Sequence, residues 1–183
     1  MEWLDVVDEN GIPTGEKVER TIAHEKGIRH RTAHVWLLRE GADGVEVLLQ
    51  KRSKNKDSHP GCYDISSAGH IPAGVEFLPS AVRELKEELG ICAQEQELQY
   101  CGQRKFLWED RFYGKRFVDN QVSNVYCLWK DISLEECILQ KEEVEEVIWM
   151  NLKECKQKVQ AGSIPNCIMM EELNMLPEYK KKI

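Results

Sequence analysis

The sequence has no long apolar run, and no stretch approaches the roughly 20 residues that a membrane-spanning helix needs. The opening residues, 1–5, also lack the apolar segment of a secretory signal. We therefore expect a protein that does not enter a membrane and that resides in the cytoplasm.

Basic residues are in the minority. The 183 residues include 32 acidic and 25 basic side chains, which gives a formal net charge of −7. Proteins that bind nucleic acids or membrane surfaces without sequence specificity usually carry a basic excess. The charge balance argues against both kinds of partner. It still allows a small phosphorylated ligand, held by a local positive pocket or by a divalent ion.

Paired cysteine spacings are missing. The seven cysteines are an odd number, so a complete disulfide framework is not expected, and a reducing compartment fits. Three histidines, His24, His30 and His34, lie near one another in the chain. They could bind a metal, but their spacing matches no standard zinc pattern, so surface and hydrogen-bonding roles are favoured.

Internal repeats, low-complexity segments and linkers are absent as well, which predicts one domain spanning 1–183. A short strand at 3–7 followed by turn residues predicts an N-terminal hairpin. Further strands are expected near 35–38, 45–51, 97–107, 117–129 and 144–149, with a turn at 110–115. Helices are expected up to Gly90, from Asn151 to Gly162 and over 166–176.

The segment Arg83-Glu84-Leu85-Lys86-Glu87-Glu88-Leu89 is the most informative stretch of the chain. Side chains three and four apart on a helix are neighbours, so three carboxylates should share one face and repel by roughly 0.2–0.5 kcal/mol per pair. The usual meaning of such a run is a solvated surface. Here, however, Leu85 and Leu89 anchor the opposite side, and a Gly/Pro-rich loop, 69–74, precedes the helix. Oxygen ligands in this arrangement suit Mg²⁺ or Mn²⁺.

The run 69–91, with Arg83-Glu84-Leu85, Glu87-Glu88 and Gly90-Ile91 in register, resembles the signature of the Nudix hydrolases. Members of this family cleave a nucleoside diphosphate linked to another moiety. The resemblance implies an α/β/α sandwich with a mixed β-sheet. It also implies that Mg²⁺, or alternatively Mn²⁺, is held by four residues: Gly69, Glu84, Glu87 and Glu88.

The resemblance also assigns catalytic roles and a small-molecule diphosphate substrate. Arg83 would orient the carboxylates, and Glu87, Glu88 or the later Glu143 would accept the proton of the attacking water. From the basic stretch 51–56, Arg52 or Lys56 would reach the substrate phosphates, although ordinary surface charge is the simpler interpretation. The sequence leaves a monomer and a homodimer equally open.

Two functions other than hydrolysis stay open. Val75 stands where the signature has glutamate; Glu76 could replace it, or the chain could be a nucleotide-binding module without strong catalysis. Together with His30, the segment 58–70 resembles the isopentenyl-diphosphate-isomerase branch, which makes an isomerase a further alternative. That enzyme has its catalytic cysteine where this chain has Ala68. An acidic residue usual in that branch is replaced by Gln121, which removes one metal ligand.

Overall fold

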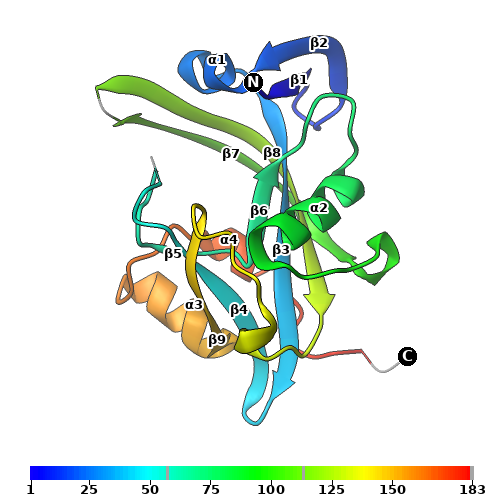
Figure 1. The fold of residues 1–183 in the computed structure, drawn as a ribbon, viewed down its shortest axis with the longest axis vertical. Coiled ribbons are helices and arrows are strands. Elements are labelled where there is room, and N and C mark those ends of the chain that lie inside the picture. The colour runs from blue at the N-terminus through cyan, green and yellow to red at the C-terminus, as the bar shows by residue number, and fades with distance from the viewer. Residues whose placement is uncertain (57, 113, 182–183) are drawn as a thin grey trace.

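The computed structural model describes residues 1–56, 58–112 and 114–181, and its centre is a mixed β-sheet (Figure 1). The strands follow the order β5-β4-β3-β8-β7, with β6 also paired to β3 and β9 to β4. Strands β3 and β8 run parallel, and the other pairs in this sheet are antiparallel. The strands are β3 (His30–Gly41), β4 (Gly44–Arg52), β5 (Tyr63–Asp64), β6 (Ser67–His70), β7 (Gln99–Phe112), β8 (Lys115–Trp129) and β9 (Val144–Asn151).

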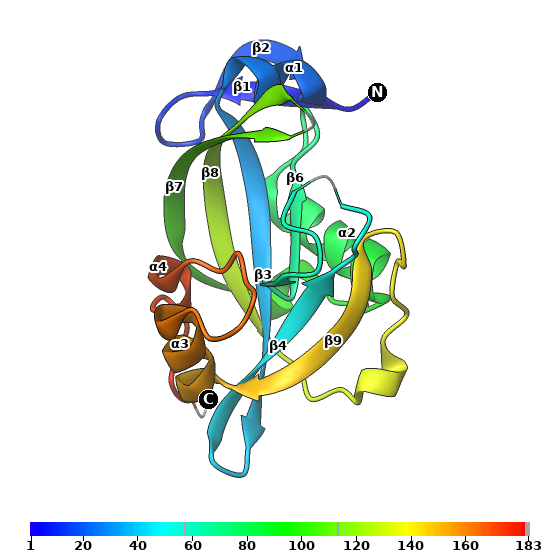
Figure 2. The same cartoon turned by 90° about the vertical axis from the view of Figure 1, so that its left-hand side faces the viewer.

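Helices cover both faces of this sheet (Figures 1 and 2). Helix α2 (Phe77–Leu89) packs Leu85 and Leu89 against one face, and α3 (Leu152–Ala161) and α4 (Met170–Leu173) cover the other. Strand β3 contacts both layers, because Val35 faces α2 and Trp36 faces α3 and α4. A strand buried on both faces is nearly continuous in apolar residues. The expected α/β/α sandwich is confirmed.

The N-terminal hairpin is also confirmed. Strands β1 (Trp3–Val7) and β2 (Pro13–Glu19) pair antiparallel and sit with α1 (Arg20–Lys26) at one end of the molecule (Figure 2). Helix α1 was not predicted from the sequence. The side chain of Glu19 caps its start, and Gly27 ends it in the left-handed conformation with φ 70°.

Two element boundaries differ from those expected. Strand β7 continues to Phe112, and the predicted turn at 110–115 includes residue 113, which lies outside the described residues. Helix α4 is shorter than the predicted 166–176, because Asn166 makes a bridge with Tyr63 and accepts the backbone N–H of Ile168 through its side chain. Single 3-10 turns occur at η1 (Glu95–Glu97) and η2 (Leu134–Glu136). Over the described ranges, no helix is long and apolar enough to span a membrane.

Candidate active site

Helix α2 holds its acidic face in a fixed position. Pro79 lies in its first turn, and Gly90 closes it with φ 70° while donating its N–H to the carbonyls of Leu85 and Lys86. Leu85 and Leu89 are fully buried on the sheet side. The acidic side chains are thus anchored by the core.

Glu88 is the most buried carboxylate of the three, with 7% of its surface exposed. It accepts hydrogen bonds from the side chain of Gln50 at 3.2 Å and from the N–H of Ala68 at 3.3 Å. Burial raises the pKa of Glu88 to about 8, and the charge of Glu84 adds to this shift. A nearby cation would favour its ionised form.

Glu84 lies against the backbone of strand β6. A Cβ atom built on Gly69 would stand 2.1 Å from the Cδ of Glu84, so only glycine permits this approach. Burial also raises the pKa of Glu84. Gly69, on the strand that precedes the helix, therefore packs directly against the carboxylate of Glu84.

Arg83 links the remaining parts of the acidic face. Its guanidinium lies 2.6 Å from Glu84 and 2.8 Å from the half-exposed Glu87, and it donates to the carbonyl of His70 at 3.4 Å. The sequence prediction that Arg83 orients these carboxylates agrees with this geometry.

The oxygen donors on this face of α2 are of the type that suits a hard divalent cation. Glu84, Glu87 and Glu88 supply oxygen atoms, and the close fit of Gly69 against Glu84 brings backbone next to carboxylate. Mg²⁺ binds through one or two carboxylates and keeps part of its water shell, so a partly open cluster suffices. These residues fit the ion that the sequence predicts.

The pKa of Glu88 leads to a stability prediction for the metal-free protein. Its folded-state pKa of about 8 lies above its ordinary value of 4.5, so stability should fall as the pH rises from about 4.5 to about 8. At about 1.4 kcal/mol per pKa unit, the loss is at most roughly 5 kcal/mol. Urea denaturation in EDTA, repeated at several pH values, measures the free energy of unfolding. This free energy should fall less steeply with rising pH in Glu88→Gln than in the wild type. The same pH dependence in both proteins would contradict this prediction.

Support for the loop before α2 comes from a residue pair that sequence reasoning missed. Arg31 binds Asp5 at 3.1 Å and the carbonyl of Val75 at 2.8 Å, and Asp5 also accepts the N–H of Gly74. Glu76 is largely exposed, and the ion pair described for it is with Arg31 at 3.6 Å. Glu76, which could replace the glutamate of the signature, is thus paired with Arg31. No local pattern connects Asp5 to a loop about 70 residues away.

The two predicted substrate-binding residues lie near one end of β4 and have different partners. Arg52 binds Asp64 at 3.0 Å and the carbonyl of Ser58 at 2.9 Å, so its guanidinium holds the loop that follows β4. Lys56 forms an ion pair with Glu143. The structure thus brings Lys56 and Glu143 together, while Arg52 is engaged by neighbouring protein groups.

A second cluster lies on the other side of strand β6. His24, His30 and His70 come from α1, β3 and β6, and their ligand atoms lie within 4.8 Å of one another. Their rings face one another with centroids 5.0–5.1 Å apart. The expected surface positions of His24, His30 and His34 were wrong, because all three are buried, whereas their expected hydrogen-bonding roles are confirmed. His70 was missed because it joins the cluster only through the pairing of β6 with β3.

The histidine cluster has the chemistry of a candidate metal centre. His24 contacts the carbonyl of Val118 and the carboxylate of Asp119, each at 3.1 Å, and His30 contacts the carbonyl of Ile28 at 2.9 Å. Such outer contacts orient metal-binding imidazoles. Burial lowers the pKa of His30 to about 4 and lowers that of His70 well below its ordinary value, which keeps both rings neutral. Neutral imidazole is the form that binds metals.

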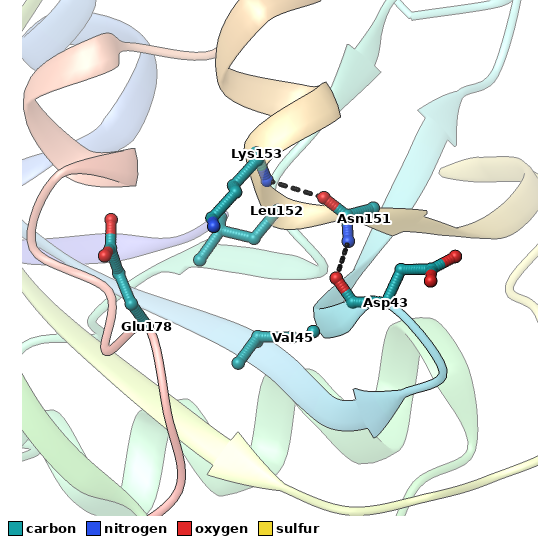
Figure 3. A pocket seen from close by; sticks show the side chains of 7 residues that line it. Asp43, Val45, Asn151, Leu152, Lys153 and Glu178 are labelled. Atoms are coloured by element: carbon teal, nitrogen blue, oxygen red, sulfur yellow. Dashed lines mark hydrogen bonds between the residues drawn. The ribbon is translucent and has the colours of Figure 1, made fainter.

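One pocket elsewhere on the molecule does not belong to either cluster. It lies between the β3–β4 turn and the start of α3, and Figure 3 shows Asn151 donating to the carbonyl of Asp43 at its edge. The same side chain accepts the N–H of Lys153 and so caps α3. The cap of α3 thus forms one edge of this pocket.

Comparison with known proteins supports the Nudix-family resemblance seen in the sequence. Residues 28–167 match the NUDIX domain. The chain is 41% identical to Nudix hydrolase 3 of Arabidopsis thaliana over 155 residues, covering 84% of this chain but only 20% of that protein. It is 35% identical to an uncharacterized Nudix hydrolase of Clostridium acetobutylicum over 153 residues, covering 84% of this chain and 71% of the other.

Solved structures share the fold. DR0079 from Deinococcus radiodurans superposes with a TM-score of 0.69 at 20% identity, covering 94% of this chain and 98% of that one. The NUDIX domain of Shewanella oneidensis NrtR, solved with ADP ribose, gives 0.55 at 15% identity, covering 86% and 94%. Sequence match, fold and the acidic helix agree, and the chain belongs to the Nudix family of pyrophosphohydrolases.

Proposed function

We propose that the protein is a Mg²⁺-dependent hydrolase that cleaves the pyrophosphate bond of a nucleoside-diphosphate derivative. The observation that carries this proposal is the placement of two shielded carboxylates against strand β6: Glu84 packs against Gly69, and Glu88 accepts the N–H of Ala68. The ADP ribose bound by the Shewanella neighbour supports a substrate of this class. The free cysteines of the chain fit the cytoplasm as its location.

The residues divide the chemistry among them. Glu84, Glu87 and the carbonyl of Gly69 would bind Mg²⁺, which supplies charge neutralisation and a bound water of lowered pKa. Glu88 lies beside them, where Gln50 and the N–H of Ala68 hold its carboxylate, and would accept the proton of the attacking water. Arg83 holds the carboxylates in place, and Lys56, paired with Glu143, contacts the outer phosphate.

A screen of nucleoside di- and triphosphates, dinucleotide polyphosphates, sugar nucleotides and coenzymes tests this function. Product release should depend on added Mg²⁺ and stop in EDTA. Failure to hydrolyse any member of the panel, despite tight ligand binding, would favour the binding-module alternative. Asp5 and Arg31 hold the loop at Val75 in place, which supports a hydrolase over the binding-module alternative.

Isomerisation of isopentenyl diphosphate is the second candidate. The histidine cluster makes a second metal centre available, but Ala68 provides no thiol for proton transfer at carbon. Incubation with isopentenyl diphosphate should therefore yield no dimethylallyl diphosphate. Appearance of that product would overturn the assignment as a hydrolase.

The histidine cluster itself should bind a transition metal such as Zn²⁺ or Mn²⁺. Removing one of three buried nitrogen ligands in His30→Gln should lower the affinity by about tenfold or more, because ligand number and geometry set metal affinity. Titration calorimetry with Zn²⁺ measures the change, and His59→Gln serves as the control outside the cluster. Equal affinities of both variants would show that the cluster is a hydrogen-bonded core.

A further inference from the structure

Strand β7 forms an open edge of the sheet. It stands last in the strand order, next to β8, and Figure 2 shows it at the margin of the molecule. Within the part of the chain that the structure describes, its backbone makes no hydrogen bond to any segment except β8. An edge strand presents a row of unpaired N–H and C=O groups, which is a template for a further strand. The outer side of β7 is therefore a candidate interaction surface.

The backbone of β7 leaves this edge open over a long stretch. Proteins usually block an edge with a short strand, a proline or a bulge. Strand β7 has 14 residues, above the usual range of about 3–10, and contains no proline. Its register with β8 shifts between Tyr100 and Gly102 and is then regular from Gly102 to Phe112, with Leu107 at the midpoint. A second strand could pair along this whole regular stretch.

Half of the regular stretch also extends beyond the rest of the sheet. Strand β3 pairs with β8 from Gln121 onward, whereas residues 107–112 of β7 pair with residues 115–120 of β8. These residues form a two-stranded arm, which Figure 1 shows continuing past the start of β3. Helix α1 contacts β8 in this arm, where His24 bonds the carbonyl of Val118. Two-stranded hairpins are marginally stable in water, so a further strand on β7 would stabilise the arm.

The sequence of this edge is complementary to itself when read in the opposite direction. Two basic residues, an aromatic residue, leucine, an aromatic residue and two acidic residues follow one another in Arg104-Lys105-Phe106-Leu107-Trp108-Glu109-Asp110. In an antiparallel pair of two such strands centred on Leu107, each residue lies opposite the one equally far from the centre. Lys105 then lies opposite Glu109 of the second copy, and Phe106 lies opposite Trp108 of the second copy. Opposite charges and aromatic pairs across strands both stabilise a sheet.

The exposed side chains favour this register over its neighbours. Lys105, Leu107 and Glu109 lie on one face of β7, because side chains alternate along a strand, and all three are exposed. Leu107 exposes 72% of its surface, an unusual position for a large apolar side chain. In the pair centred on Leu107, two leucines meet and two Lys105–Glu109 contacts flank them. Moving the centre to Trp108 would instead place Lys105 opposite Arg111, and like charges directly opposite each other destabilise the pair.

We propose that the outer edge of β7 is a dimerisation surface, on which a second copy of this chain pairs its own β7 antiparallel and centred on Leu107. The two sheets then form one continuous sheet across a twofold axis, and each copy contributes the same residues to the contact. Main-chain hydrogen bonds hold such an added strand, and the side chains determine its specificity. The proposal does not depend on the hydrolase activity.

Sedimentation equilibrium of two charge-reversal variants, Lys105→Glu and Glu109→Lys, tests the proposal. The wild type should dimerise at micromolar concentrations. Each variant alone places like charges opposite each other at both symmetric contacts, so its dimer Kd should rise about tenfold or more. An equimolar mixture of the two variants should regain the wild-type Kd. In the mixed dimer the two introduced charges face each other with opposite sign, and the native Lys105 of one copy faces the native Glu109 of the other.

Two controls separate the contact between copies from effects within one chain. Lys153→Glu reverses an exposed charge on α3 and should keep the wild-type Kd. Glu109→Lys also removes the ion pair that Glu109 makes with Arg116 at 2.9 Å in its own chain. Mixing cannot restore that pair, so recovery in the mixture identifies the contact between copies.

Three results would overturn the proposal: a wild type that stays monomeric, variants that dimerise as tightly as the wild type, or a mixture that dimerises no better than its components. Circular dichroism and melting temperatures establish that the variants are folded, which is expected because both positions are exposed.

Discussion

Replacement of Glu88 by glutamine should lower kcat by about 10²- to 10⁴-fold, the range typical of losing a positioned general base. Glutamine has nearly the same volume and can still accept from Gln50 and Ala68. The side chain is protonated at neutral pH when no metal is bound, so the fold should tolerate the neutral amide well. Steady-state kinetics at saturating substrate and Mg²⁺ measure the effect.

The matched control for this substitution is Glu95→Gln. Glu95 is an exposed glutamate of η1, outside α2, so its kinetics should match those of the wild type. Melting temperatures of both variants establish that they are folded. Activity of Glu88→Gln within threefold of the wild type would remove Glu88 from the mechanism.

Gly69→Ala is expected to be nearly as damaging, for a steric reason. The added methyl group would stand 2.1 Å from the Cδ of Glu84, far inside contact distance, and must displace either the carboxylate or strand β6. Misplacing a catalytic group by about 1 Å can cost 10²-fold in rate. We expect a loss of that size in kcat/KM and a weaker dependence on Mg²⁺ concentration.

Gly102→Ala is the corresponding control. The three atoms nearest to its Cβ would all belong to the side chain of Met175, with the sulfur at 2.9 Å, and that flexible side chain can move aside. The two alanine variants therefore separate a general effect of glycine replacement from a specific collision at the acidic site. Equal, mild effects would show that the close approach of Gly69 to Glu84 has no functional importance.

Local patterns in the sequence predicted the acidic helix well. The spacing of Glu84 and Glu88, the apolar Leu85 and Leu89 and the cap at Gly90 are all determined within one helix of 13 residues. Strand alternation likewise indicated which elements form the sheet. These features depend on neighbours in the chain, which is why sequence reasoning reached them.

Contacts between segments far apart in the sequence could not be predicted from local patterns. Asp5 supports the loop at Val75 through Arg31, and His70 joins His24 and His30 only because β6 pairs with β3. None of these pairings has a local signal, and the histidine spacing matched no standard site. The surface assignment of the histidines failed because burial depends on the assembled sheet.

The most direct test of the acidic site is a crystal soaked in Mn²⁺ with anomalous diffraction recorded. We predict a peak bounded by the carboxylates of Glu84 and Glu87 and the carbonyl of Gly69. A peak confined to His24, His30 and His70, with the carboxylates open to solvent and no density beside Gly69, would contradict the proposed metal site and the hydrolytic mechanism built on it.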